Sequence, residues 1–279
     1  EQRIRPGWDD KILADWNGMM IGAMARASAV FNEPGWLAAA ERAWTFVADT
    51  MRVGDRLWHA ARHGKVRNAG MLEDYANMAK AGLVLFEVTG TPAYLERARA
   101  WTATLDQFFW DAAQGGYYQT ASDGEQLIAR PRNASDNAVP SGNGTMVGVL
   151  ARLYLHTGDD TYRDRARQLI DAFTPEIVRN FFGLTTFLNN VDLWMKPVQV
   201  AIIGDRTDTA TRALITEAYA LASPNLVLSV TAPGGALPAN HPAAGKPQKG
   251  GKATAYICIG ETCSLPVTDA AAMIEAVPK

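Results

Sequence analysis

Three clusters of polar and aromatic side chains stand at comparable places in the chain, each near the expected start of a long helix. The first holds Asp10, Trp16 and Asn17, the second holds Glu73, Asp74 and Tyr75, and the third holds Asp136, Asn137, Ser141 and Asn143. Two carboxylates at one opening are the machinery of glycoside hydrolysis, in which one protonates the leaving oxygen and the other acts as nucleophile or base. Aromatic side chains beside them offer flat apolar surfaces with polar tips that can line a pocket.

Each of these side chains also has a structural explanation. Acidic residues and Ser are preferred helix N-caps, and Ser141 is best explained as a cap because no nucleophile elbow or paired His accompanies it. Asp10 and Glu73 suit capping and catalysis equally well. Asp74 follows Glu73 directly, so one of the two must turn toward the interior. Asn17 is a poor helix former inside an apolar helix, and we expect it to have a buried hydrogen-bonding role.

Two histidines, His59 and His63, flank Arg62 between the first and second clusters. Their i, i+4 spacing suits a metal only on a helix, and Gly64 makes this stretch look irregular, so we expect no metal here. An imidazole has an ordinary pKa near 6.5 and can act as acid or base. In a sugar pocket either histidine could therefore move a proton at a sugar carbon. Trp58 beside His59 adds a stacking surface.

These considerations give two groups of candidates. The catalytic candidates are Asp10, His59, Glu73, Asp74 and Asp136. The substrate-binding candidates are Trp16, Asn17, Trp58, Tyr75, Asn137, Ser141 and Asn143. The expected ligand is a carbohydrate or another small molecule, and no cofactor is expected.

The helices that must position these clusters follow a repeat. A turn, an aromatic residue and a helix rich in Ala and Arg recur three times, with aromatic anchors at Trp36, Tyr94 and Tyr162. Each copy follows a longer helix whose apolar residues keep the 3.6-residue period. Such a repeat is typical of helical hairpins, which bury their apolar faces only by stacking on neighbours. Hairpins arranged in a ring leave their connecting loops at one rim, so the three clusters should meet there.

The remaining segments are less regular. Long connections run over 54–70 and 111–140. Such segments are usually functional or pair locally as short strands, and the second should contain a β-hairpin within residues 115–125. Strands over 198–204, 226–230 and 256–259 and a helix over 207–221 then predict a small α/β appendage. We therefore divide the chain into a hairpin portion, 1–195, and an appendage, 196–279.

Composition narrows the class of protein. The 279 residues are 48% hydrophobic, enough for a sizeable core, and the net charge of −2 with no basic stripe argues against nucleic acid. No apolar run approaches a membrane span or a secretory signal. Cys258 and Cys263 are too few for a disulfide scaffold and lack a second pair for zinc, so we expect two half-buried strand cysteines rather than a redox pair. The cytoplasm is the default compartment.

Four motifs occur in a specific order and cover nearly the whole chain, at residues 9–18, 72–76, 140–143 and 262–269. Together they resemble the C-terminal part of the thioredoxin-domain-containing proteins related to spermatogenesis-associated protein 20. The resemblance implies a mainly α fold, an (α/α) toroid similar to the six-hairpin glycosidases and to sugar epimerases of the N-acylglucosamine 2-epimerase type. The three hairpins of this chain would then form a partial six-hairpin barrel.

The resemblance also bears on partners and function. In that family a thioredoxin-like domain precedes the toroid, so the expected partners are that domain, the missing half of the ring, or a second copy of the chain. A half ring exposes an apolar edge that soluble monomers rarely tolerate. Two functions stay open. One is a carbohydrate-active domain, either a glycoside hydrolase or an epimerase, and the other is a non-catalytic binding or scaffold domain.

Overall fold

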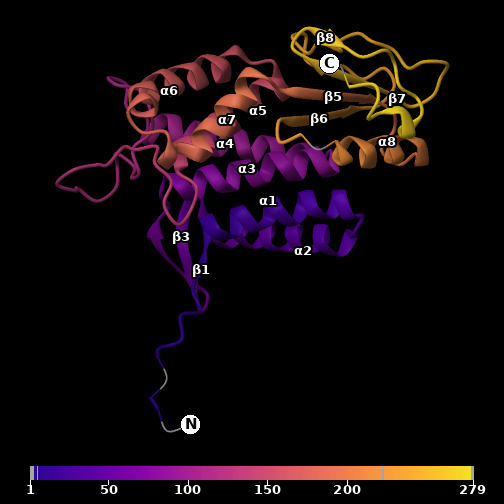
Figure 1. The fold of residues 1–279 in the computed structure, drawn as a ribbon. Coiled ribbons are helices and arrows are strands. Elements are labelled where there is room, and N and C mark those ends of the chain that lie inside the picture. Colours follow the sequence, from indigo (N-terminus) through magenta and orange to yellow (C-terminus); the bar gives the residue numbers. More distant parts are fainter. Residues whose placement is uncertain (1–2, 5, 222, 278–279) are drawn as a thin grey trace.

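The computed structural model describes residues 3–4, 6–221 and 223–277, and its first two thirds are mainly helical (Figure 1). The helices are α1 (Ala14–Phe31), α2 (Pro34–Thr45), α3 (Leu72–Thr89), α4 (Pro92–Phe108), α5 (Gly142–Thr157), α6 (Asp160–Arg179), α7 (Thr185–Met195) and α8 (Thr209–Ala220). The strands are β1 (Ile12–Leu13), β2 (Arg52–Val53), β3 (Arg56–Arg62), β4 (Lys65–Ala69), β5 (Val198–Ile203), β6 (Leu226–Thr231), β7 (Thr254–Ile259) and β8 (Thr262–Cys263).

Helices α1 to α6 pair as the repeat predicts, α1 with α2, α3 with α4 and α5 with α6. The first helix of each pair ends on a residue in the left-handed conformation, at Asn32, Gly90 and Gly158. That conformation breaks the backbone hydrogen-bond pattern and turns the chain back, and Gly adopts it without steric penalty. Pro34 and Pro92 then occupy the first helical turn of α2 and α4, where a missing N–H does no harm.

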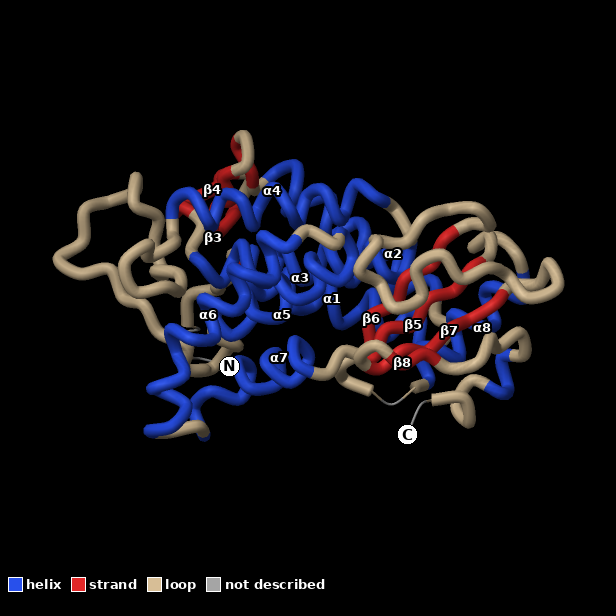
Figure 2. Tube along the Cα trace, turned by 90° about the horizontal axis from the view of Figure 1, so that it is seen from above, coloured by secondary structure: helices blue, strands red, loops and turns tan. Residues whose placement is uncertain are grey.

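The first helices of the pairs also pack in sequence, α1 against α3, α3 against α5 and α5 against α7, while α2, α4 and α6 lie outside them (Figure 2). Helix α7 was not expected from the sequence. It packs on α5 and extends the inner row beyond the three hairpins. Large buried aromatics such as Trp101, Phe109 and Phe173 fill the space between the two layers. The row of inner helices is therefore the scaffold on which the polar clusters sit.

The C-terminal part forms a sheet in the order β6-β5-β7-β8, with β5 parallel to β6 and antiparallel to β7. The strands lie close to the residues expected from their apolar runs. Ala29 of α1 and Val88 of α3 pack against the core of this sheet. The sheet therefore sits at the C-terminal ends of α1 and α3, whereas β1 and β3 lie at their N-terminal ends (Figure 1).

Short strands in the segment 54–70 are confirmed, because β3 pairs antiparallel with β4 and with β1, and the irregular stretch around Gly64 is not observed. Two other local predictions are wrong. The segment 115–125 forms no hairpin, since its described residues contribute one isolated bridge, between Trp110 and Tyr117, followed by turns. Cys258 and Cys263 are not separate thiols, because they face each other across β7 and β8 and form a disulfide. Among the helices described, none is long and apolar enough to cross a bilayer.

Close packing of α1 on α3 depends on Gly18, which generates a first prediction. A Cβ at this position would lie 2.7 Å from the backbone carbon of Asn77, whereas a Cβ on Gly22 would lie 3.7 Å from the nearest atom, the Cα of Ala81. We expect Gly18→Ala to lower the free energy of unfolding by about 1–3 kcal/mol through overpacking. Gly22→Ala should be neutral or stabilising by about 0.5–1 kcal/mol, because Ala favours a helix. Urea unfolding measures both, and equal effects would contradict the proposed contact.

Candidate functional site

A cleft of about 410 Å³ opens at the N-terminal ends of the inner helices. Its walls combine the start of α1, strand β3, the first turn of α3 and the segment 133–141 that leads into α5. The acidic and imidazole side chains that line it are Asp15, His59, Glu73, Asp74 and Asp136. The second and third clusters of the sequence thus contribute to one opening, together with Asp15 from the motif that holds the first cluster.

Asp74 is completely buried and joins three of these segments. Its Oδ1 accepts a hydrogen bond from the backbone N–H of Asp15 at 3.0 Å, and its Oδ2 accepts one from the N–H of Met71 at 2.7 Å. The Nδ1 of His59 lies 3.0 Å from both oxygens. When Nδ1 carries the proton shared with Asp74, Nε2 is the ring nitrogen left for a ligand in the cleft.

The environment of His59 favours its protonated form. The hydrogen bond to Asp74 raises the pKa of His59, desolvation opposes this, and the charges of Asp74 and Asp15 raise it further. The net direction is upward from the ordinary value of 6.5. The raised pKa makes the imidazole a stronger base than an exposed histidine, which favours proton abstraction when the ring is neutral.

Asp15 is the acidic residue that the candidate list omitted. It is 7% exposed, lies in the first turn of α1 and lines the cleft beside His59. Desolvation raises the pKa of Asp15, and the neighbouring charge of Asp74 raises it further. A signal was present, because Asp15 belongs to the same motif as Asp10, but sequence spacing alone did not show which of the two carboxylates faces inward.

Glu73 lies next to Asp74 at the start of α3 and faces the cleft. Desolvation raises its pKa, although hydrogen bonds from backbone N–H groups, including that of Gly142, act in the opposite direction. The Gly142 N–H lies 3.4 Å from Oε1, a long contact that leaves the carboxyl group accessible to a ligand. Glu73 is therefore suited to carrying a proton at a higher pH than an exposed glutamate.

Asp136 and Ser141 form the opposite wall, where both have structural partners. The two Asp136 oxygens accept hydrogen bonds from the N–H groups of Ser141 and Thr186, at 2.9 and 2.7 Å. Ser141 caps α5, since its Oγ accepts from the N–H of Gly144 at 3.1 Å. Asn137 is exposed and lines the cleft. These contacts anchor the wall and leave less of the Asp136 carboxylate for chemistry.

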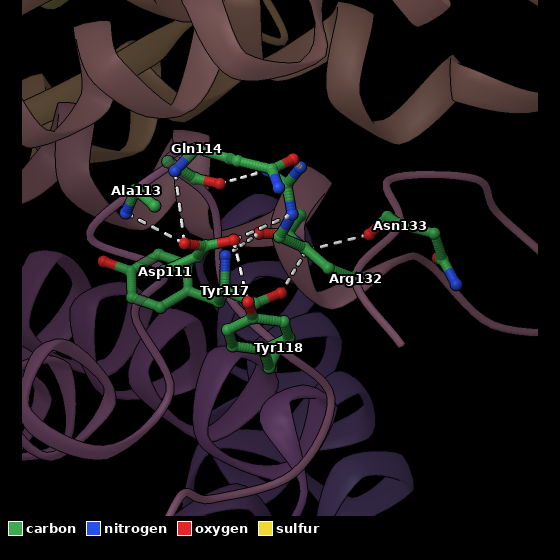
Figure 3. Close-up of polar contacts among 9 residues, drawn as sticks. Asp111, Ala113, Gln114, Tyr117, Tyr118, Arg132 and Asn133 are labelled. Atoms are coloured by element: carbon green, nitrogen blue, oxygen red, sulfur yellow. Dashed lines mark hydrogen bonds and ion pairs between the residues drawn. The ribbon is translucent and has the colours of Figure 1, made fainter. Parts of the chain in front are cut away.

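The long loop before that wall is held by a polar network (Figure 3). Asp111 accepts hydrogen bonds from the N–H groups of Ala113 and Gln114 and from the hydroxyl of Tyr118, and Arg132 lies 3.6 Å from its carboxylate. Desolvation acts to raise the pKa of Asp111, but these hydrogen bonds lower it overall. The network fixes the chain just before Asn133, which lines the cleft.

Two candidates belong to the protein interior. Tyr75 is completely buried, packs on Phe109 and accepts a hydrogen bond from the N–H of Leu57, so it offers no stacking surface. Asn143 is also completely buried and exchanges hydrogen bonds with both backbone groups of Tyr117. Both residues follow a cleft residue by one or two positions on a helix, and helical rotation turns them toward the core.

Four further candidates lie outside the cleft lining. Asp10 pairs with Arg62 and, at 3.4 Å, with His63 on the surface near β1 and β3. Trp16 is 58% exposed on α1. Asn17 is half-buried and donates to the carbonyl of Leu13, the residue that precedes its helix, so the expected hydrogen bond is present but is not fully buried. Trp58 precedes His59 on β3, where successive side chains point to opposite faces.

Asp15, His59 and Asp74 also offer three metal-ligand atoms within 4.8 Å of one another. Two carboxylates and an imidazole suit a divalent transition metal. Asp74 already accepts two backbone hydrogen bonds in addition to the contact with His59, so a metal would have to compete with the imidazole for its oxygens. The geometry fits a hydrogen-bonded His–Asp pair better than a metal centre.

The chain resembles known proteins in sequence and in fold. No protein-family model matches the chain. The chain is 30% identical to spermatogenesis-associated protein 20 of Homo sapiens over 284 residues, which cover 96% of the chain and 36% of that protein. The mouse protein of the same name is 29% identical over a similar length. The chain therefore spans about a third of the length of these relatives.

Solved structures share the fold at low sequence identity. A GH76 α-mannanase of Bacteroides thetaiotaomicron has a TM-score of 0.56 and 13% identity, covering 75% of this chain and 58% of its own. A cellobiose 2-epimerase of Spirochaeta thermophila has a TM-score of 0.52 and 17% identity, covering 61% and 45%. The chain is thus similar over nearly its whole length to part of spermatogenesis-associated protein 20, and it shares a helical fold of the α/α-toroid type with these two enzymes.

Proposed function

We propose that the cleft binds a carbohydrate and that His59 transfers a proton at a sugar carbon, as an epimerase or isomerase requires. The observation that carries this proposal is the His59–Asp74 pair, with Nδ1 held at 3.0 Å and the imidazole lining the cleft. Structures with the same fold include a cellobiose 2-epimerase and a GH76 α-mannanase, which supports a carbohydrate ligand without choosing a reaction.

The proposed step removes the proton from the carbon next to the carbonyl group of an open-chain sugar. Neutral His59 accepts that proton at Nε2, and the electron pair moves to the carbonyl oxygen, which a protonated Glu73 stabilises by donating a hydrogen bond or its proton. For the isomer, His59 returns the proton to the neighbouring carbon, and the hydroxyl group on the original carbon gives its proton to the Glu73 carboxylate and becomes the new carbonyl group. For the epimer, water protonates the opposite face of the original carbon, the resulting hydroxide takes the proton from His59, and Glu73 recovers its proton as the carbonyl group re-forms. No atoms are gained or lost.

Glycoside hydrolysis is the second candidate, because the raised pKa of Glu73 suits a general acid. Hydrolysis also needs an ionised carboxylate that is free to attack the sugar or activate water. Asp74 and Asp136 already hold backbone N–H groups, and desolvation raises the pKa of Asp15. Proton transfer through His59 therefore fits the geometry better. A non-catalytic carbohydrate-binding domain is the third reading, expected to bind sugars without turnover.

Replacing His59 provides a direct test, with His63 as the matched control. We expect His59→Gln to abolish turnover, whereas His63→Gln should leave it unchanged, because the His63 side chain is 73% exposed and pairs with Asp10 outside the cleft. The assay incubates the chain with reducing sugars in D₂O and follows proton NMR spectra. Solvent deuterium at a sugar carbon indicates proton transfer, and a new reducing end indicates hydrolysis. Sugar binding with neither signal would refute catalysis, and EDTA treatment tests for a metal.

Asp74 should set the pH dependence of turnover through its contact with His59. As a base, His59 must be neutral, so kcat/KM should rise as pH increases through its raised pKa, above 6.5. Asp74→Asn should move that inflection to lower pH, measurable also by NMR titration of the imidazole. Because the folded-state pKa exceeds the unfolded value, the stabilisation from the pair is complete below about pH 6.5 and is lost as pH rises through the folded-state pKa. An unshifted inflection in Asp74→Asn would contradict the pairing.

Replacing Glu73 should affect catalysis, whereas replacing Asp136 should affect thermal stability. We expect Glu73→Gln to lower kcat by roughly 10²–10⁴ with little change in Tm, because the contact of its carboxylate with the Gly142 N–H is long. Asp136→Asn should instead lower Tm, because one of the two N–H groups it holds loses a charged acceptor. Initial rates and thermal unfolding measure both variants. A lower Tm for Glu73→Gln with an unchanged kcat would show that Glu73 has a structural role instead.

A further inference from the structure

A second cavity, of about 670 Å³, runs along the inner row of helices. It is lined by α1, α3, α5 and α7, the helices that lie side by side in Figure 2. Its charged lining residues are Arg26, Lys80 and Arg152, and no carboxylate is among the described residues that line it. Its charge is therefore opposite to that of the cleft described above.

The positive charge of this groove is only partly neutralised. Arg152 pairs with the buried Glu87 at 2.6 Å and donates to the carbonyl of Leu226. The Nη2 of Arg26 makes one long contact with a carbonyl, that of Ser223, at 3.4 Å. Lys80 has no ion pair or side-chain hydrogen bond with any residue that the structure describes. Lys80 is solvent-exposed where it lines the groove, and desolvation together with the charges of Arg152 and Arg26 lowers its pKa.

An unsatisfied amide lies in the same lining. Asn77 of α3 is 3% exposed and contributes to the groove, and its Nδ2 has no hydrogen-bond partner among the described residues. Buried donors are almost always paired, and one without a partner indicates a missing acceptor. An anion would supply acceptor oxygens to this amide and compensate the charges of Lys80 and Arg26 at the same time.

The groove adjoins the acidic cleft. Pro140 lines both cavities, and α1 and α3 each contribute residues to both. Along α1 the first turn carries Asp15 to the cleft and the next turn carries Gly18 to the groove. Along α3, Asp74 lines the cleft and Asn77 the groove. The two cavities are therefore neighbours along α1 and α3.

We propose that Lys80, Arg26 and Asn77 bind the anionic group of the ligand, so that the carbohydrate of the proposed function is an acidic one, carrying a carboxylate or a phosphate ester. This inference rests on the proposed function for its link to catalysis, but the anion subsite is testable by itself. Carboxylates of the cleft repel an anion and cations of the groove attract it, so the charge pattern fixes which end of the ligand enters each cavity. The neutral end of the sugar then faces His59.

Binding of small anionic sugars tests the subsite. Titration calorimetry at low ionic strength compares glucuronate and glucose 6-phosphate with glucose as the neutral control. We expect at least one anionic sugar to bind about tenfold more tightly than glucose, and the two arms distinguish a carboxylate from a phosphate site. Lys80→Gln should remove this advantage, Lys80→Arg should retain most of it, and Lys65→Gln, at an exposed lysine of β4, should have no effect.

The outcomes separate this inference from the proposed function. His59→Gln should keep the advantage of the anionic sugar over glucose, even where it abolishes turnover. Anion binding without any turnover would support the subsite and count against proton transfer by His59. Equal affinities for glucose and both anionic sugars, or an affinity insensitive to Lys80→Gln, would overturn the subsite. Should Lys80→Gln not fold, NMR shifts of the wild-type residues around Asn77 on adding glucuronate or glucose 6-phosphate decide the question.

Discussion

The carboxylate of Asp74 holds together the segments that make the cleft. It lies in the first turn of α3, completely buried, and accepts hydrogen bonds from the backbone of α1 and from the residue that precedes α3. It also contacts the imidazole of His59 on β3. A buried carboxylate is tolerated only when donors surround it. The need to satisfy one charge therefore sets the mutual position of α1, β3 and α3, and the site follows from that position.

Charged side chains also divide the row of inner helices into an acidic part and a basic part. Carboxylates gather where α1 and α3 begin, close to the partial positive charge of helix N-termini, which stabilises them. Cations stand further along α1, α3 and α5, at Arg26, Lys80 and Arg152. The only acidic partner of Arg152 in the described ion pairs is Glu87, which also contacts His156. One row of helices thus carries an acidic cleft and a basic groove end to end.

Much of the fold was predictable because it depends on local chemistry. Helical periodicity, the left-handed residues Gly90 and Gly158 and the prolines that start α2 and α4 act within a few residues. Stacking of the hairpins then brought Glu73, Asp74, Asp136 and His59 to one opening. The sequence left open whether residues 54–70 form strands, and it did not indicate helix α7, because the stability of both comes from packing on distant segments rather than from local propensity.

The sequence by itself determined that helical hairpins stack in a row and that their polar helix starts meet at one rim, because periodicity and turn chemistry are local. Only the tertiary structure decided which side chains of each cluster face the opening. A helix turns each successive residue by about 100°, so Asp15 faces inward while Trp16 faces solvent, and Tyr75 enters the core beside Asp74. Which direction is the interior depends on neighbouring helices far along the chain, and no spacing within a motif contains that information.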